Sequence, residues 1–225
     1  MKIKKEFLLE DYGLDEAWGW KWGKDKTKKE GENMVTDDIA MAITNKQYDI
    51  IPGLLKKRKK IDPIVLNWAV SDSDVKLIDI LLKNGVTPTP ENIDYAIISQ
   101  NTDMLPYILK NITPTSDNLV KAIKSNNDEA VESLLQHNID TTGRTNLLNM
   151  AIISRNVNII NSVLQKVKVV PDNTTMLLVI SMNDPEILKA LISHNIIPKK
   201  EDYQRASNAK NINDDLLRTF EKYSR

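Results

Sequence analysis

Two histidines, His137 and His194, are the side chains of this sequence best suited to proton transfer or metal binding. They occupy the same place in two units of an internal repeat, and one further unit lies between them. Neighbouring helices pack about 8–10 Å apart, so equivalent atoms two units apart are separated by about 20 Å. We therefore do not expect the two histidines to share a metal ion or to act as a catalytic pair.

Other residue patterns for catalysis are missing from the sequence. It has no cysteine, and the motifs G-x-S-x-G, G-x-x-x-x-G-K-[ST] and H-E-x-x-H do not occur. The acidic pairs Asp37-Asp38 and Asp214-Asp215 are typical of the first turn of a helix, where carboxylates favour the helix dipole. We expect no catalytic residue, no cofactor and no metal site, so the sequence predicts a protein that is not an enzyme.

Composition narrows the expected partners and environment. The 225 residues include 31 Lys+Arg and 31 Asp+Glu, so the formal charge is zero, whereas a protein that coats DNA is normally basic. Nucleic acid is therefore not the expected partner. The apolar run Phe7-Leu8-Leu9 is shorter than the roughly 7–15 residues of a signal peptide or the roughly 20 of a membrane span. We expect a cytoplasmic protein that does not associate with a membrane.

A repeat of about 27 residues organises most of the chain. Each unit is numbered from a small residue, defined as position zero, and these residues are 27, 27, 26 and 29 residues apart in the first five units. Position zero is occupied by Ala42, Ala69, Ala96, Ala122, Ala151 and, in a sixth unit, Val179. Aliphatic pairs follow at +12 and +13: Leu54-Leu55, Leu81-Leu82, Ile108-Leu109, Leu134-Leu135, Val163-Leu164 and Leu191-Ile192. Further aliphatic residues recur at −3, +1, +8 and +9, so each unit is predicted to contain two helices.

Polar residues mark the ends of these predicted helices. Position +5 is occupied by Asp74, Asn101, Asn127, Asn156 and Asp184, whereas the first unit has Gln47. Asp and Asn side chains accept hydrogen bonds from the first amides of a helix, so they predict N-caps of the second helix. Thr115, and Thr89 followed by Pro90, are expected to cap first helices. At position +16, left-handed residues that end the second helix are predicted at Gly85, Asn138 and Asn195.

The repeat defines the expected fold class and domain organisation. A pair of helices of about ten residues cannot bury its apolar side alone, but stacked pairs cover one another. The sequence therefore predicts an all-α solenoid of helical hairpins with terminal caps. We assign six repeats to residues 36–198, a capping or docking segment to residues 1–35 and a helical cap to residues 199–225.

Two units resemble ankyrin repeats. In the fifth unit, Gly143-Arg144-Thr145-Asn146-Leu147, Ala151, Ile159-Ile160 and Val163-Leu164 are similar to the family pattern G-x-T-P-L-H-x-A followed by E-I-V-x-x-L-L. Leu81-Leu82-Lys83-Asn84-Gly85 in the second unit is similar to the family's L-L-x-x-G. The period is shorter than the family's 33 residues, no unit has the histidine of T-P-L-H, and Val86-Thr87-Pro88 is too short for a full β-hairpin.

The resemblance implies a divergent, short-loop ankyrin-like array over roughly residues 36–198. Such arrays bind partner proteins in a concave groove, and they are frequent in large DNA viruses and some phages. The resemblance therefore implies a scaffold that binds a partner protein. One form of this function is a viral or phage factor that captures a protein in the host cytoplasm.

The side of the first helix that faces away from the core is rich in apolar residues. A rotation of about 100° per residue places positions −5, −1 and +2 on this side. Position −1 holds Met41, Trp68, Tyr95, Lys121, Met150 and Leu178, and position +2 holds Thr44, Ser71, Ile98, Lys124, Ile153 and Ser181. We predict that a partner binds Met41, Trp68, Tyr95, Ile98, Met150 and Ile153. The alternative is that these residues pack against neighbouring helices.

Two further segments have two interpretations each. Residues 1–35 contain Trp18, Trp20 and Trp22, which either cover the first unit or dock a partner. In the docking interpretation, the chain is a structural or assembly protein that self-associates as a homo-oligomer or attaches to a particle through this segment. Lys56-Lys57-Arg58-Lys59-Lys60 is either the solvated end of a second helix or a targeting or phosphate-binding patch.

Overall fold

The computed structural model describes residues 37–58, 61–142, 144 and 146–224. Residues 1–35, with Trp18, Trp20 and Trp22, lie outside the described residues, as do Lys59 and Lys60. Every regular element in the described ranges is a helix, which confirms the all-α class. The helices are α3 (Asp37–Thr44), α4 (Ile51–Lys56), α5 (Ile64–Ser71), α6 (Val75–Lys83), α7 (Pro90–Ile98), the 3-10 helix η1 (Thr102–Met104), α8 (Leu105–Ile108), α9 (Ser116–Lys124), α10 (Asp128–Leu135), α11 (Leu147–Ile153), α12 (Val157–Lys166), α13 (Thr175–Met182), α14 (Pro185–Ser193), α15 (Lys200–Ser207) and α16 (Asp214–Tyr223).

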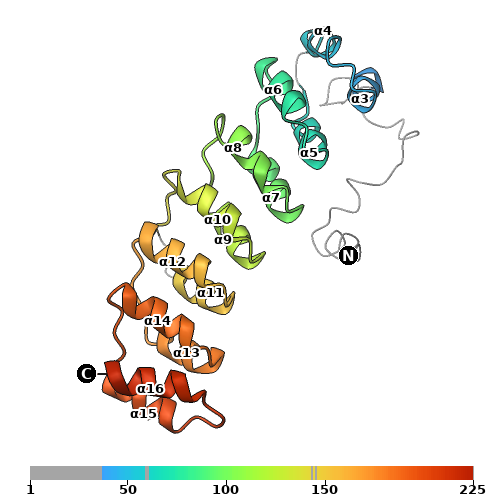
Figure 1. Ribbon diagram of the computed structural model, residues 1–225. Coiled ribbons are helices and arrows are strands. Elements are labelled where there is room, and N and C mark those ends of the chain that lie inside the picture. The colour runs from blue at the N-terminus through green and yellow to red at the C-terminus, as the bar shows by residue number, and fades with distance from the viewer. Residues whose placement is uncertain (1–36, 59–60, 143, 145, 225) are drawn as a thin grey trace, which may run out of the picture.

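The described helices form consecutive pairs that stack in a curved row (Figure 1). We call the odd-numbered helix of each pair, from α3 to α15, the first helix, and the even-numbered one, from α4 to α16, the second helix. First helices contact first helices of the next pair, as α5 contacts α7 and α7 contacts α9. Second helices do the same, as α10 contacts α12 and α12 contacts α14. Figure 1 shows the first helices along the concave side of the row.

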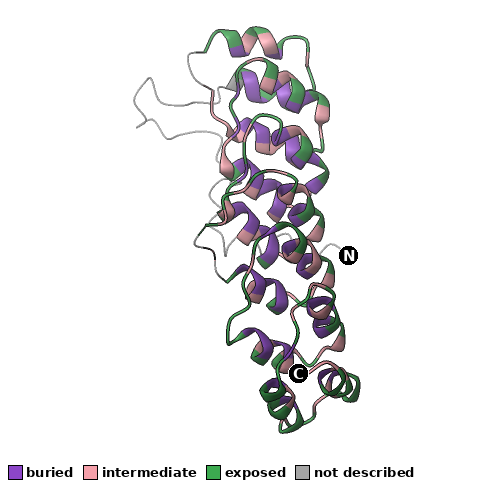
Figure 2. Ribbon diagram, turned by 90° about the vertical axis from the view of Figure 1, so that its left-hand side faces the viewer, coloured by how far each residue is buried: buried purple, intermediate pink, exposed green. Residues whose placement is uncertain are grey.

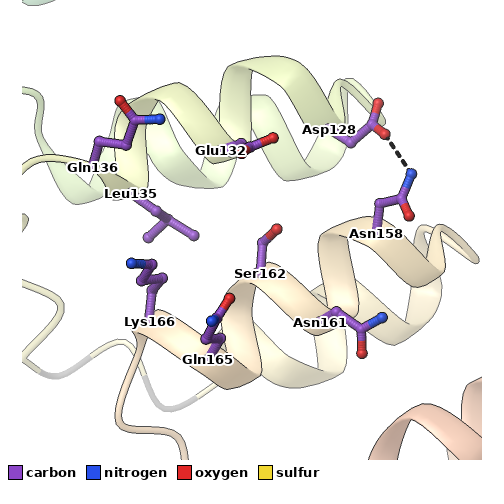
Figure 3. A pocket seen from close by; sticks show the side chains of 9 residues that line it. All are labelled: Asp128, Glu132, Leu135, Gln136, Asn158, Asn161, Ser162, Gln165 and Lys166. Atoms are coloured by element: carbon purple, nitrogen blue, oxygen red, sulfur yellow. Dashed lines mark hydrogen bonds between the residues drawn. The ribbon is translucent and has the colours of Figure 1, made fainter.

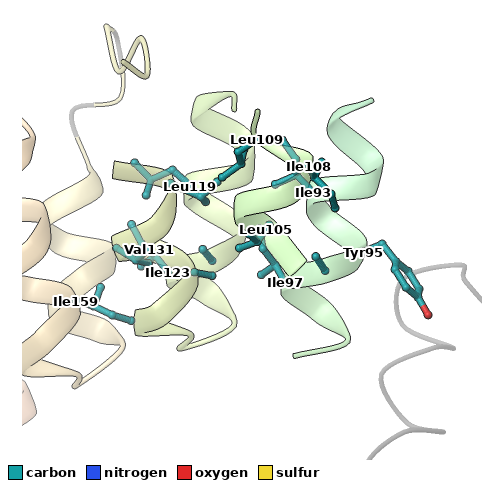
Figure 4. Packing of buried hydrophobic residues seen from close by; sticks show 14 of the residues in the cluster. Ile93, Tyr95, Ile97, Leu105, Ile108, Leu109, Leu119, Ile123, Val131 and Ile159 are labelled. Carbon is teal, nitrogen blue, oxygen red and sulfur yellow. The ribbon is translucent and has the colours of Figure 1, made fainter. Parts of the chain in front are cut away.

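Small and aliphatic side chains make the contacts between pairs. Ala69, Ala96, Ala122 and Ala151 at position zero are fully buried, as is Val179. Buried residues continue along the whole described row, with exposed residues on its outer surfaces (Figure 2). Figure 4 shows part of this core, including Ile93, Ile97, Leu105, Ile108, Leu119, Ile123, Val131 and Ile159. Because each pair is packed against its neighbours, the stack fixes the position of every first helix.

Each first helix of the repeat ends in a residue with left-handed backbone at position +4. These residues are Lys46, Ser73, Gln100, Asn126, Arg155 and Asn183, with φ between 51° and 60°. In the third unit, the Gln100 N–H donates to the Ile97 carbonyl over 3.2 Å, and the Asn101 N–H donates to the Ala96 carbonyl over 3.0 Å. This is the Schellman arrangement, which satisfies two carbonyls at the end of a helix.

The residue after the left-handed one begins the second helix in most units. The Asp74 carboxylate accepts from the Leu77 N–H over 2.9 Å, and the Asn127 side chain accepts from the Ala130 N–H over 3.0 Å. Asn156 and Asp184 cap α12 and α14 in the same way. The predicted caps at these four positions are therefore confirmed. Asp74 and Asn127 also donate their N–H to the Ala69 and Ala122 carbonyls, so each of these two residues closes one helix and starts the next.

Two sequence-based expectations about helix ends are wrong. Asn101 does not cap its helix: its amide nitrogen donates to the Val70 carbonyl of the preceding unit over 2.8 Å, and its side chain accepts no bond from the first amides of the second helix. Its second helix begins instead as η1 and continues as the short α8, which contains Pro106. The predicted left-handed ends of second helices occur at Gly85 and Asn195, but Asn138 does not have a positive φ.

The left-handed residues lead to a prediction about stability. Gln100 has a φ of 60° and its neighbour Ser99 has a φ of −72°. A side chain with a Cβ is disfavoured in the left-handed region, so we expect Gln100→Gly to raise the free energy of unfolding by about 0.5–1 kcal/mol. Thermal unfolding should show an increase in Tm of about 1–4 °C.

Ser99→Gly is the matched control, one residue away in the same turn. At a right-handed position glycine adds conformational entropy to the unfolded chain, and this change also removes the bond that the Ser99 hydroxyl donates to the Tyr95 carbonyl over 2.7 Å, so it should lower stability by about 1–2 kcal/mol. Equal effects of the two substitutions would show that the left-handed turn is not formed.

Candidate partner-binding groove

The residues predicted to line a groove differ in exposure. Met41 on α3 and Ile153 on α11 are exposed, at 62% and 56% of their surface. Trp68, Ile98 and Met150 are half-buried on α5, α7 and α11. Trp68 and Met150 also pack partly against the core. The predicted partner-binding residues are therefore partly exposed and partly packed against neighbouring helices. We use the term concave stripe for positions −1 and +2 of the first helices.

Tyr95 is buried, so its predicted exposure is wrong. Only 7% of its surface is accessible, although Figure 4 shows its side chain projecting from α7 away from the labelled aliphatic core residues. Burial raises the pKa of the Tyr95 hydroxyl above its ordinary value, and a hydrogen bond shared with Ser71 acts against this rise. The hydrogen bond with Ser71 places the Tyr95 hydroxyl against the end of the preceding first helix, α5.

Two lysines interrupt the apolar residues in the middle of the concave stripe. Lys121 and Lys124 both lie on α9, at positions −1 and +2. The Lys121 ammonium pairs with the Asp94 carboxylate of the preceding first helix. Lys124 is exposed, and no carboxylate of the described residues lies within 4 Å of its ammonium. The stripe therefore has an uncompensated positive charge between two apolar parts.

A ladder of buried polar residues holds the first helices in register. Asn92 donates to Asn67 Oδ1 over 2.8 Å, and Asn118 donates to Asp94 Oδ1 over 2.7 Å. Both asparagines are almost fully buried, and each also donates to a proline carbonyl of the preceding unit. Thr175 makes the equivalent bond to Asn149 over 3.0 Å. These bonds fix the offset between neighbouring first helices, and therefore the spacing of the side chains on the concave stripe.

The ladder was missed by the sequence-based reasoning, although a signal for it exists. In Thr89-Pro90-Glu91-Asn92 and Thr115-Ser116-Asp117-Asn118, an asparagine follows the capping threonine by three residues. Asn92 Oδ1 accepts from the Thr89 N–H over 2.8 Å, and Asn118 Oδ1 accepts from the Thr115 N–H over 2.9 Å. The T-x-x-N pattern is thus a capping box whose amide group also reaches the preceding unit.

A polar cleft lies on the other side of the row, between the second helices α10 and α12. Its volume is about 480 Å³, and Figure 3 shows Glu132, Gln136, Ser162, Gln165 and Lys166 around it. Asn158 donates to the Asp128 carboxylate over 2.9 Å at one end. Of its charged side chains, Glu132 and Lys166 are exposed and Asp128 is half-buried and bonded to Asn158, which is not the environment of a catalytic group.

The structure does not bring residues of a metal or membrane site together in its described part. His137 follows α10 and His194 ends α14, two units away. Among the described residues, no three His, Asp or Glu side chains form a group that could hold a metal ion. None of the described helices has the length and apolar character needed to cross a membrane.

No family model, curated protein or solved structure matches the chain. Evidence for the class of protein therefore comes from its helix pairs and from the residues of the concave stripe.

Proposed function

We propose that this chain is an ankyrin-like, non-enzymatic scaffold that binds a partner protein along its concave stripe. The observation that supports the proposal most strongly is the exposure of Met41 and Ile153, because most other apolar residues of their two helices are buried. Exposed apolar side chains on one face are typical of interaction sites, and these two lie in separate parts of the concave stripe, on α3 and α11. The stacking of helical pairs and the likeness of single units to ankyrin repeats support the same assignment.

Partial burial of Trp68, Ile98 and Met150 fits this function. Trp68 and Met150 pack partly against the core, so they lose little conformational entropy when a partner covers their outer atoms. Leu177, on α13 of the next pair, is also exposed. A partner that covers these residues removes apolar surface from water, which contributes about 25 cal/mol per Å².

Affinity capture with matched variants tests the proposal. The wild-type chain and a Met41→Asp, Ile153→Asp double variant are immobilised, and the captured proteins from cells of the native source are quantified by mass spectrometry. We expect at least one protein to be captured by the wild type and lost about tenfold or more with the double variant, because interface anchors contribute about 1–2 kcal/mol each.

Gln165→Asp, an exposed substitution on α12, is the control. It adds a charge on the second helices and leaves the concave stripe unchanged, so capture should persist. If both variants capture the same proteins as the wild type, or if only Gln165→Asp loses them, the concave stripe is not the binding surface.

A further inference from the structure

The charges of the concave stripe restrict the chemistry of its partner. In the third to fifth units, Ile98 of α7 and Ile153 of α11 lie on either side of Lys124 of α9, all three at position +2. Neighbouring first helices pack about 8–10 Å apart, so the two isoleucines are separated by about 20 Å with the lysine midway. This part of the stripe is therefore apolar at its ends and cationic in its middle.

The central cation of this part of the stripe, Lys124, forms no ion pair with the described residues. Lys121 on the same helix is paired with Asp94, but Lys124 has no carboxylate within 4 Å among the described residues. The same is true of Arg155, the exposed left-handed residue that follows α11 two residues after Ile153. Two cations thus remain available beside an exposed apolar side chain.

We infer that the groove binds an acidic peptide segment, with carboxylates on Lys124 and Arg155 and apolar side chains on Ile98 and Ile153. The inference rests on the proposed function and specifies the chemistry of its partner. Carboxylates complement the two unpaired cations, and aliphatic side chains complement the two isoleucines. A nucleic acid fits less well, because Ile98 and Ile153 offer no ring for base stacking and Asp94 lies on the same side.

Peptide selection on the whole chain tests the inference. The probe is a displayed library of random peptides of about 12 residues, since an extended chain needs about six residues to span about 20 Å. We expect the selected peptides to be enriched in Asp or Glu next to Leu, Ile or Phe. Their affinity should fall about tenfold or more in Lys124→Glu and in Arg155→Glu, and it should weaken when salt is raised from about 50 to about 500 mM.

Lys166→Glu is the matched control, because Lys166 is an exposed lysine of the polar cleft on α12. It makes the same change of charge on the other side of the row and should leave peptide affinity unchanged. Replacing the acidic residues of a selected peptide by lysine should abolish binding to the wild type and restore it with Lys124→Glu.

The outcomes separate this inference from the proposed function. Selected peptides without acidic enrichment that lose binding in Ile153→Asp overturn the acidic partner and leave the groove intact. Peptides whose binding depends on Lys166 and not on Ile153 or Lys124 overturn both. Failure to select any peptide, or displacement of the peptides by a labelled single-stranded RNA, overturns the acidic peptide as the occupant.

Discussion

Replacing Ala96 by arginine is expected to lower the free energy of unfolding by more than about 4 kcal/mol. Ala96 is fully buried at position zero of α7, which contacts both α5 and α9. A larger side chain overpacks a tight core at a cost of about 1–3 kcal/mol. A buried guanidinium without a carboxylate partner costs several kcal/mol more. Because α7 lies in the middle of the row, the substitution should separate the two halves of the stack.

Urea unfolding followed by far-ultraviolet circular dichroism measures this effect. We expect Ala96→Arg to shift the midpoint to much lower urea and to broaden the transition as the cooperativity of the row is lost. Ser181→Arg places the same side chain at an exposed position of α13 and should change stability by less than about 0.5 kcal/mol. A loss below about 1 kcal/mol for Ala96→Arg would show that first helices do not pack together at position zero.

Removing the amide of Asn118 is expected to cost about 2–4 kcal/mol. This side chain donates to Asp94 Oδ1 and to the Pro90 carbonyl, over 2.7 and 3.1 Å, and accepts from the Thr115 N–H. Asn118→Ala takes these partners from the half-buried Asp94 and Pro90 oxygens, and each unsatisfied group costs about 1–3 kcal/mol. Asn111→Ala, at an exposed asparagine after α8, is the control and should have little effect.

Asn118→Asp tests the ladder through its pH dependence. The substitution places a second carboxylate beside that of Asp94, so the pKa of the pair is raised in the folded state. Protonation relieves the repulsion, and the variant should therefore regain stability relative to the wild type as the pH falls from about 7 to about 4. A constant difference in unfolding free energy over this range would contradict the contact between the two positions.

The periodic aliphatic residues were sufficient to predict the helices and most of the caps. Second helices are capped where an Asp or Asn side chain accepts a bond from the first amides of the same helix, as at Asp74, Asn127, Asn156 and Asp184. Thr115 caps α9 for the same reason. These features depend on residues near in sequence, so the sequence was informative about them.

The left-handed turns were not predictable from residue type. Lys46, Ser73, Gln100 and Arg155 have no preference for positive φ, and the turn geometry between the two helices imposes it on them. Asn101 differs from the other predicted caps because its second helix begins as the 3-10 helix η1, in which the Met104 N–H donates to the Asn101 backbone carbonyl. The repeat pattern does not predict this different first turn.

Exposure along the concave stripe was predicted only in part. Met41 and Ile153 are exposed as expected, whereas Tyr95 at an equivalent position is buried. A repeat pattern treats all −1 residues alike, but their exposure depends on the size of the side chain and on what covers it. The pairing of Lys121 with Asp94, which leaves Lys124 as the available cation, depends in the same way on three-dimensional neighbours.

Hydrogen–deuterium exchange of the chain, with and without the captured partner protein, tests the proposed binding surface most directly. The account predicts slower exchange on binding in the first helices α7, α9 and α11 and in the turns that follow them, with little change in α10 and α12. Protection confined to the second helices, or no protection along the concave stripe, would contradict it.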